Sequence, residues 1–277
     1  RSDALKAIKK QKETVIRNMA AERYQQEIRK GGGEPAKVAL VESYILRDCI
    51  AGMKELPERS FNLVEVDPPY AIGLDKIKKA QDRHVLETYT EVGVEEYEPL
   101  MRAVFSEGYR LLAQDGWLLC WFAHDPWFHP LVSWIREAGF SLFAVPALWY
   151  KPSFAGQTRM PETRMGTCYE PFFYARKGNA VMNRQGRKNV FEYTVVSPER
   201  KSHPTERPIE MMEDVITTFC PPSGRVLVPF AGSGNTLIAG SNVGTRGVAF
   251  DLSETFRNSF VARVSAGEVG KIKSYLQ

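Results

Sequence analysis

A chain of 277 residues, 43% hydrophobic and 25% charged, can bury the core of one large domain or two small ones. This composition excludes a disordered tail and a collagen, and no uninterrupted apolar run is long enough for a membrane span. The formal net charge of +4 permits an anionic partner but does not identify one.

The four cysteines favour an intracellular protein. Cys49, Cys120, Cys168 and Cys220 form no C-x-x-C pair, and none lies at metal-binding spacing from another Cys or a His. We therefore expect reduced thiols in a cytoplasmic protein, and no metal site. The first ten residues lack the apolar run of a secretory signal, which agrees with this expectation.

Residues 1–30 are expected to form a basic helix, because apolar residues recur there at helical spacing. This stretch holds nine Lys or Arg residues against four acids, so nearly all of the excess positive charge lies in it. Two interpretations stay open: a solvated helix packed on one side, or an arm that contacts phosphate groups. The run Gly31-Gly32-Gly33-Glu34-Pro35 ends the helix. We expect a basic helix and linker at 1–35 and a main domain at 36–277.

After this linker, predicted strands and helices alternate. The expected strands are 37–44, 61–66, 117–123, 142–150, 171–175, 225–228 and 246–250, and the expected helices are 49–56, 95–113, 127–138, 209–219, 236–242 and 254–266. Such alternation is typical of an α/β fold with a mostly parallel sheet and helices on both faces. Ligands of such sheets bind beyond the carboxyl ends of the strands, which directs attention to the loops there.

The loop after the strand at 61–66 displays three kinds of chemical group together. It reads Asp67-Pro68-Pro69-Tyr70, and its two prolines stiffen the backbone. A carboxylate, a fixed carbonyl and an aromatic ring suit a flat heterocycle that bears an exocyclic amino group. Tyr70 can stack on the ring, while Asp67 and the Pro68 carbonyl each accept one amino hydrogen. The structural alternative is that the prolines only stop the strand.

A second loop joins the strand at 225–228 to the helix at 236–242. Gly232 and Gly234 allow the backbone to approach a ligand closely, and the helix offers free amide groups at its N-terminus. The loop lacks the full G-x-G-x-x-G spacing and the lysine of a phosphate-binding loop. A dinucleotide or a nucleoside triphosphate is therefore not favoured.

Two further segments carry polar residues near the same edge. Asp251 follows the strand at 246–250, where an acid suits a ribose diol. The alternative is that it caps the helix beginning near Ser253. The segment His203-Pro204-Thr205-Glu206-Arg207-Pro208 precedes the helix at 209–219, where Thr205 is able to cap and a proline is readily accepted.

Together these segments resemble the amino-methylating DNA methyltransferases, which modify adenine N6 or cytosine N4 with S-adenosylmethionine. The resemblance extends over most of the chain, from Lys37 to Ser265. It is carried by R-D-C at 47–49, D-P-P-Y at 67–70, W-Y-K-P at 149–152, Y-E at 169–170, H-P-T-E-R-P at 203–208, P-F-A-G-S-G-N-T at 229–236 and D-L-S at 251–253. Because D-P-P-Y precedes the glycine loop, the motif order is similar to the permuted β-type arrangement, as in methylase domains of phages and mobile elements.

This resemblance implies a Rossmann-like, S-adenosylmethionine-dependent methyltransferase domain at 36–277, in a bacterial or phage-infected cell. It implies catalytic roles for Asp67, Pro68, Pro69 and Tyr70. It implies cofactor binding by Asp48, Cys49, His203, Thr205, Phe230, Gly232, Ser233, Gly234, Asn235, Thr236, Asp251 and Leu252. Two positions depart from the family pattern, because Val228 replaces an Asp and Ala249 replaces a Glu.

The same resemblance implies a reaction and a substrate. The target is an adenine N6 amino group in duplex DNA, since cytosine-N4 enzymes usually carry Ser where this chain has Asp67. The base has to be flipped out of the duplex before the amino group is accessible. Neither a metal nor a covalent intermediate is needed.

Two basic segments are expected to contact DNA. Lys76, Lys78 and Lys79 lie in the polar stretch 71–93, which is able to close over a flipped base. Arg184, Arg187 and Lys188 lie in a short target-recognition segment near 178–202. The alternative for each is a plain solvated basic loop. Because so short a segment offers few side chains to base edges, we expect a short recognition sequence or relaxed specificity.

Three alternatives to an adenine-N6 DNA methyltransferase stay open. The target is cytosine N4, or it is adenine in RNA, or the chain is a catalytically silent nucleic-acid-binding partner of the same fold. Val228 and Ala249 motivate the silent partner, whereas the intact D-P-P-Y argues against it. The sequence does not determine the oligomeric state or the recognition site.

Overall fold

The structure is a computed structural model that describes residues 34–72, 92–152, 156, 158, 160–196 and 206–267. Some predicted features lie outside the described residues: the helix at 1–30, the three lysines Lys76, Lys78 and Lys79, and the residues His203 and Thr205.

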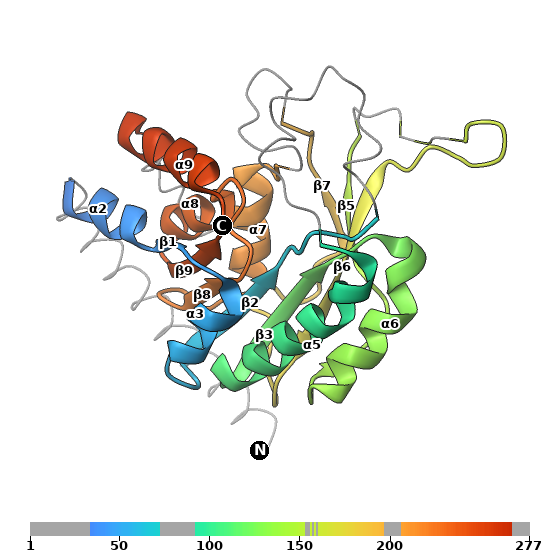
Figure 1. The fold of residues 1–277 in the computed structure, drawn as a ribbon, viewed down its shortest axis with the longest axis horizontal. Coiled ribbons are helices and arrows are strands. Elements are labelled where there is room, and N and C mark those ends of the chain that lie inside the picture. Colours follow the sequence, from blue (N-terminus) through green and yellow to red (C-terminus); the bar gives the residue numbers. More distant parts are fainter. Residues whose placement is uncertain are drawn as a thin grey trace, which may run out of the picture.

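One mixed sheet runs through the described part of the chain (Figure 1). Its strands are β1 (Tyr44–Leu46), β2 (Phe61–Val66), β3 (Leu112–Trp121), β4 (Ser141–Leu142), β5 (Ala147–Tyr150), β6 (Tyr169–Arg176), β7 (Val190–Glu192), β8 (Arg225–Val228) and β9 (Arg246–Asp251). Their order is β1-β9-β8-β2-β3-β6-β5-β7, and β4 pairs with β6. The strands from β1 to β3 in this order are parallel, whereas β6 is antiparallel to β3, β4 and β5.

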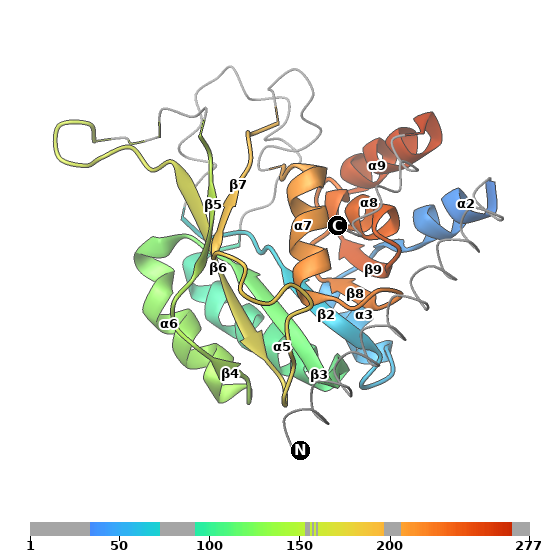
Figure 2. The same cartoon turned by 180° about the vertical axis from the view of Figure 1, so that it is seen from behind.

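Helices cover both faces of the sheet, so the expected α/β architecture is confirmed. Helices α3 (Cys49–Glu55), α5 (Val94–Leu111) and α6 (His124–Glu137) lie on one face (Figure 1). Helices α7 (Ile209–Phe219), α8 (Asn235–Asn242) and α9 (Glu254–Ala266) lie on the other, with α2 (Glu34–Glu42) packed near α9 (Figure 2).

The two central elements of the core show why these segments fold as they do. Strand β2 is buried on both faces, which is typical of a central parallel strand and agrees with its mainly apolar sequence, in which Asn62 and Glu65 are the polar residues. Helix α5 buries Tyr97, Met101, Val104 and Phe105, which recur at helical spacing and so form one apolar stripe. The predictions at 61–66, 209–219, 225–228 and 254–266 agree with the structure residue for residue.

The strand expected at 37–44 is wrong. This stretch forms helix α2, and β1 begins only at Tyr44. The run of apolar and β-branched residues suggested a strand. In the structure Leu40 is buried and Lys37 and Val41 are partly buried, while Val38 and Ala39 are exposed. This spacing of three and four residues matches one face of a helix.

Other predicted segments differ in detail. The strand expected at 117–123 begins at Leu112, directly after α5, and ends at Trp121. The strand expected at 142–150 is two strands, β4 and β5, separated by a stretch that contains Pro146. The short recognition segment expected at 178–202 contains strand β7, which pairs with β5. A strand of three residues is too short to show a periodicity, so the sequence pattern did not indicate it.

The strand order brings the predicted loops to one edge of the sheet. The parallel strands β2, β8 and β9 are neighbours, so the D-P-P-Y loop, the glycine loop and Asp251 all follow carboxyl ends at the same edge. After β2 the chain continues to β3 on one side, and after β8 it continues to β9 on the other. This reversal between β2 and β8 is the place where ligands bind in open α/β sheets.

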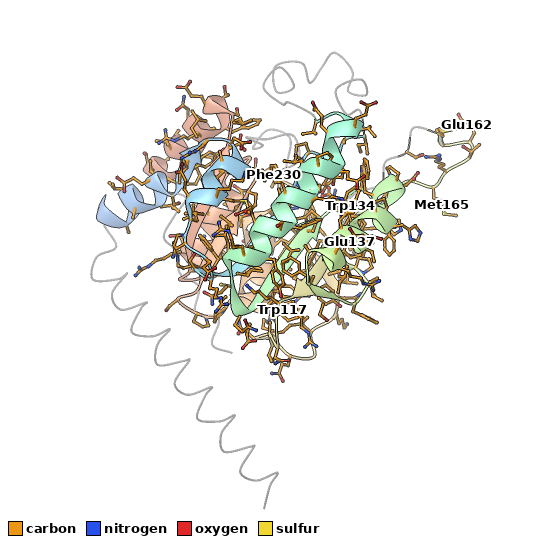
Figure 3. The ribbon with its side chains drawn as sticks, turned by 60° about the horizontal axis from the view of Figure 1, so that its bottom comes forward. Trp117, Trp134, Glu137, Glu162, Met165 and Phe230 are labelled. Carbon is orange, nitrogen blue, oxygen red and sulfur yellow. The ribbon has the colours of Figure 1, made fainter. Side chains whose placement is uncertain are left out.

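The segment between β5 and β6 extends away from the layered body. Glu162 and Met165 lie on its outer part (Figure 3), and Met165 is almost fully exposed. None of the helices that the structure describes has both the length and the apolar character needed to cross a bilayer.

Candidate active site

A cavity of about 540 Å³ opens at the edge where β2, β8 and β9 end. This volume is typical of small-molecule sites. Its lining includes every predicted catalytic residue, Asp67, Pro68, Pro69 and Tyr70. It also includes the predicted cofactor residues Asp48, Cys49, Phe230, Gly232, Ser233, Asn235, Thr236, Asp251 and Leu252. Gly234 does not line the cavity but shapes the loop that does.

The glycine loop is held in a left-handed conformation that only glycine adopts readily. Gly232 has φ +49° and Gly234 has φ +74°. The Gly232 amide donates to Oδ2 of Asp251 at 2.8 Å, and its carbonyl accepts the Tyr44 hydroxyl at 2.8 Å. Both backbone polar groups of Gly232 are therefore bonded to side chains of strands β9 and β1. The residues that follow begin helix α8 at the cavity.

Asp251 links the glycine loop to the start of α9 through its two carboxylate oxygens. Oδ2 accepts the Gly232 amide and Oδ1 accepts the Ser253 amide, each at 2.8 Å. Ser253, not Asp251, is the N-cap of α9, because its hydroxyl accepts the Phe256 amide. Burial raises the pKa of Asp251, and the two amides oppose that shift.

We expect Asp251→Asn to weaken S-adenosylmethionine binding about tenfold or more. An Asn side chain has one carbonyl oxygen, so one of the two half-buried amides loses its acceptor, at a cost of about 1–3 kcal/mol. Titration calorimetry measures the change. Asp115→Asn is the matched control, because Asp115 also accepts a backbone amide, from Asn179, but is far from the cavity in the fold. An equal loss in both variants would contradict this role of Asp251.

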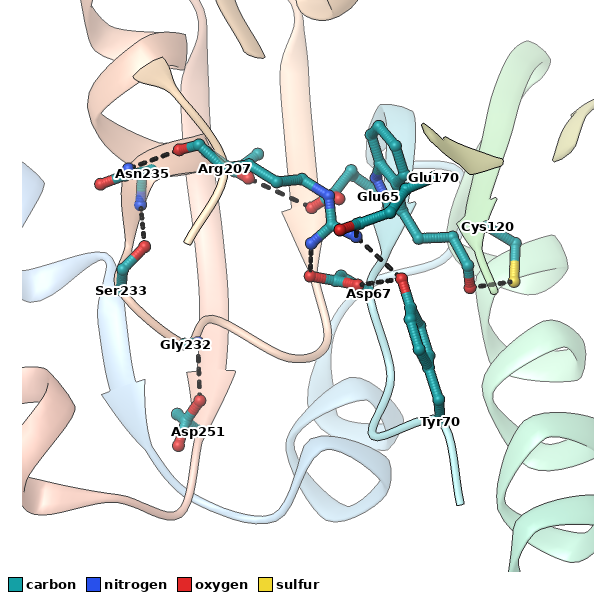
Figure 4. A network of polar contacts seen from close by, with 12 residues as sticks. Glu65, Asp67, Tyr70, Cys120, Glu170, Arg207, Gly232, Ser233, Asn235 and Asp251 are labelled. Atoms are coloured by element: carbon teal, nitrogen blue, oxygen red, sulfur yellow. Dashed lines mark hydrogen bonds and ion pairs between the residues drawn. The ribbon is translucent and has the colours of Figure 1, made fainter. Parts of the chain in front are cut away.

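The D-P-P-Y loop is tied to a buried arginine that sequence analysis did not single out. Asp67 Oδ2 forms an ion pair with Nη1 of Arg207, and Tyr70 donates its hydroxyl to Asp67 Oδ1 at 3.2 Å (Figure 4). Nη2 of Arg207 donates to the Tyr70 hydroxyl at 2.9 Å and to Glu170 at 3.2 Å. Arg207 stands in the H-P-T-E-R-P segment and Glu170 in the Y-E pair, so both motifs reach the site.

A buried acid, Glu65, lies on β2 two residues before Asp67. It is 2% exposed and accepts the Thr236 hydroxyl at 3.2 Å. Burial raises the pKa of Glu65, and the nearby positive charge of Arg207 opposes this shift. A carboxyl group in an otherwise apolar central strand was the sequence signal that could have identified it.

We expect Glu65→Gln to remove a pH dependence of stability. Above the ordinary Glu pKa, the unfolded chain has released a proton that folded Glu65 still holds. The free energy of unfolding therefore falls as pH rises toward the raised folded pKa, by at most about 1.4 kcal/mol per pH unit. Urea unfolding from pH 5 to pH 8 measures this effect. The free energy of unfolding of the variant should rise relative to that of the natural chain as the pH increases. A constant difference across this range would show that burial does not raise this pKa.

Asp48 and Cys49 have local structural contacts at the cavity. Asp48 is the N-cap of α3 and accepts the Ala51 amide at 2.8 Å. Burial is the main cause that raises the pKa of Cys49 to about 12. The Cys49 thiol therefore stays protonated at neutral pH and is no nucleophile.

The two departures from the family pattern lie side by side. Val228 on β8 and Ala249 on β9 are paired across the ladder, and both are buried. They form one apolar contact, at two positions where the resemblance described above implies an Asp and a Glu. Asp251, two residues beyond Ala249, remains at the cavity.

The predicted DNA-contacting arginines are paired within the protein. Arg184 and Arg187 both form ion pairs with Asp214 of α7, and Tyr193 donates its hydroxyl to the same carboxylate at 3.1 Å. Lys188 is exposed. These contacts attach the segment at 184–193 to α7, and its contact with DNA stays a prediction.

Comparison with known proteins gives the family. The model of the N6_N4_Mtase family, described as DNA methylase, matches residues 61–262. The chain belongs to this DNA methylase family. The methylase is 25% identical over 223 residues to YubD of Escherichia coli (strain K12), a protein named as a methylase, covering 80% of this chain and 90% of that one.

Solved structures of methyltransferases share the fold of this methylase. The M1.HpyAVI–SAM complex is 17% identical, with a TM-score of 0.61 over 80% of this chain and 98% of the other. PvuII DNA methyltransferase, whose title gives it as cytosine-N4-specific, is 18% identical, with a TM-score of 0.61 over 82% and 93%. The expected S-adenosylmethionine-dependent methyltransferase fold is confirmed. The protein is a DNA methyltransferase, and its cofactor is S-adenosylmethionine.

The cavity suits this cofactor chemically. S-adenosylmethionine combines a sulfonium, an amino acid group and a nucleoside, so it requires acidic, amide and apolar surfaces together. The lining provides carboxylates at Asp251 and Asp48, the glycine-loop backbone, and apolar side chains such as Phe230 and Leu252.

Proposed function

We propose that this methylase transfers a methyl group to the N6 amino group of adenine in duplex DNA, after the base has been flipped out of the helix. The observation that carries the proposal is the placement of Asp67 and Tyr70. They lie beside each other at the carboxyl end of β2, on the wall of the same cavity as the glycine loop. A flipped base and the cofactor therefore share one space.

In this proposal the D-P-P-Y loop performs the chemistry of the amino group. The adenine amino nitrogen is a poor nucleophile because its lone pair is conjugated with the ring. Asp67 and the Pro68 carbonyl accept the amino hydrogens, which directs the nitrogen lone pair away from the ring system. Tyr70 holds the flipped base by stacking. S-adenosylmethionine, when bound, would supply an electrophilic methyl group and leave as S-adenosylhomocysteine, while the amino group gives up one of its two protons. Positioning and electrostatics provide most of the rate enhancement.

We further propose that the cofactor is held by the glycine loop, by Asp251 at the ribose, and by Asp48, Cys49, Phe230, Leu252, His203 and Thr205. Lys76, Lys78 and Lys79 would contact phosphates near the flipped base. Arg184, Arg187 and Lys188 would contribute to target recognition, with the two arginines oriented by Asp214.

The test is methyl transfer from labelled S-adenosylmethionine to unmethylated duplex DNA, followed by analysis of the nucleosides. N6-methyladenine is the expected product. N4-methylcytosine would replace the proposed base and keep the class of reaction, and transfer to RNA but not to DNA would replace the substrate. If label is not incorporated and the cofactor does not bind, the chain is a silent partner.

A further inference from the structure

Arg207 is the charged side chain that joins the elements of this site. It precedes α7, is 6% exposed and reaches the D-P-P-Y loop from across the cavity (Figure 4). Its guanidinium contacts Asp67, Tyr70 and Glu170, and its Cζ lies 4.0 Å from the centroid of the Trp121 ring. A planar group with several fixed donors is suited to bridging three acceptors at once.

The burial of Arg207 disfavours the charged form of its guanidinium. Burial lowers the pKa of Arg207 to about 9, and Glu65 opposes that shift. Glu170, which accepts from Arg207, is also paired with Lys151 at 2.5 Å. The carboxylate of Glu170 is thus shared between two cations, and Asp67 is the other carboxylate in contact with Arg207. Removing one partner of a buried ion pair leaves an uncompensated charge, so the guanidinium of Arg207 depends on its carboxylate partners.

Arg207 and Tyr70 fix both oxygens of Asp67. Oδ2 contacts the guanidinium and Oδ1 accepts the Tyr70 hydroxyl, while that hydroxyl accepts from Arg207 in turn. These three groups form a closed triangle that stops the carboxylate from rotating. Each carboxylate oxygen has a second lone pair, so Asp67 can still accept an amino hydrogen of the substrate.

The backbone of Arg207 is held separately from its side chain. Nδ2 of Asn235, at the start of α8, donates to the Arg207 carbonyl at 2.7 Å and to Glu206 at 2.9 Å. Asn235 belongs to the glycine loop at the cofactor end of the cavity. Arg207 therefore connects this loop, through its main chain, to the D-P-P-Y loop, through its guanidinium.

We propose that Arg207 is a positioning residue, which holds the Asp67 carboxylate and the Tyr70 hydroxyl in the orientation needed for methyl transfer. The proposal rests on the proposed role of Asp67 in accepting the amino hydrogens. Asp67 contacts the substrate, and Arg207 acts through Asp67. Displacing a reacting group by about 1 Å can reduce a rate about 100-fold, which sets the size of the expected effect.

The experiment compares Arg207→Met and Arg207→Lys with the natural chain. For Arg207→Met we expect kcat to fall about 100-fold, with the KM for DNA and the Kd for S-adenosylmethionine changed less than about threefold. For Arg207→Lys, which keeps the charge but not the planar fork, we expect a loss of about tenfold. Arg110→Met is the matched control, because Arg110 also bridges a carboxylate and two carbonyls, at the opposite end of α5.

Three outcomes would overturn the proposal. A folded Arg207→Met variant that keeps kcat within about threefold would show that Asp67 needs no such support. A loss of cofactor affinity that matches the loss of kcat would make Arg207 a cofactor residue. If the Met variant does not fold, the Lys variant is the test. An unchanged kcat in Arg207→Lys would show that methyl transfer does not need the planar guanidinium that bridges the three acceptors. Failure of the proposed function is seen separately, in the natural chain, as methyl transfer to a different base or as an active Asp67→Ala variant.

Discussion

Asp67→Ala is expected to reduce methyl transfer by at least about 10²–10³-fold while S-adenosylmethionine binding is kept. The carboxylate is the group in the D-P-P-Y loop that can accept an amino hydrogen and also place negative charge beside a nitrogen that becomes positive. Alanine removes both effects. The Pro68 carbonyl remains, but one acceptor cannot orient an amino group in the plane of its ring.

The cofactor should be unaffected because none of its proposed contacts lies in the D-P-P-Y loop. They lie in the glycine loop and the start of α8, at the end of β9, at the start of α3 and in the segment before α7. Single-turnover transfer and calorimetry measure the two properties separately. Asp67→Asn serves as a second variant, since it keeps the size of the side chain and removes the charge beside Arg207. We expect it to be nearly as inactive as the Ala variant. Near-normal turnover in both variants would show that Asp67 does not contact the amino group.

Much of the fold follows from local sequence patterns. The helix at 209–219 and the strand at 225–228 have strong periodicity and clear boundaries, and the structure has both. The proximity of the three loops of the site could be predicted because parallel strands end at one edge of the sheet. Where the local pattern was ambiguous, as in the apolar run that became α2, packing against α9, α8 and β1 decided the outcome.

The contacts among the charged residues of the site could not be predicted from local sequence patterns. Glu65, Glu170 and Arg207 are far apart along the chain, and none of them has a partner at a fixed spacing. Their contacts depend on how the segment before α7 crosses the cavity. The pairing of Arg184 and Arg187 with Asp214 is of the same kind. A basic cluster in a sequence predicts an anionic partner, but an acid on a distant helix satisfies that prediction as well as DNA does.

Gly234→Ala is expected to destabilise the fold and the cofactor loop together. Gly234 has φ +74°, a conformation that costs an alanine about 1–2 kcal/mol. A Cβ atom there would lie 2.3 Å from the ring of Phe260, which is fully buried on α9. Because that ring has no free space to move into, overpacking adds about 1–3 kcal/mol. The total loss of about 2–5 kcal/mol would lower Tm by several degrees.

Gly186→Ala separates the two causes. Gly186 also has φ +74°, but a Cβ atom there would meet nothing within 4 Å. This variant should therefore lose only the backbone contribution, about 1–2 kcal/mol. The difference between the variants measures the contact with Phe260, and Gly234→Ala alone should weaken S-adenosylmethionine binding, since Gly234 begins the helix at the cavity. Thermal unfolding and calorimetry of both proteins give these values. Equal losses of stability in the two variants would show that the Phe260 ring moves aside at no cost. Unchanged cofactor affinity in Gly234→Ala would show that the loop binds its ligand without this backbone conformation.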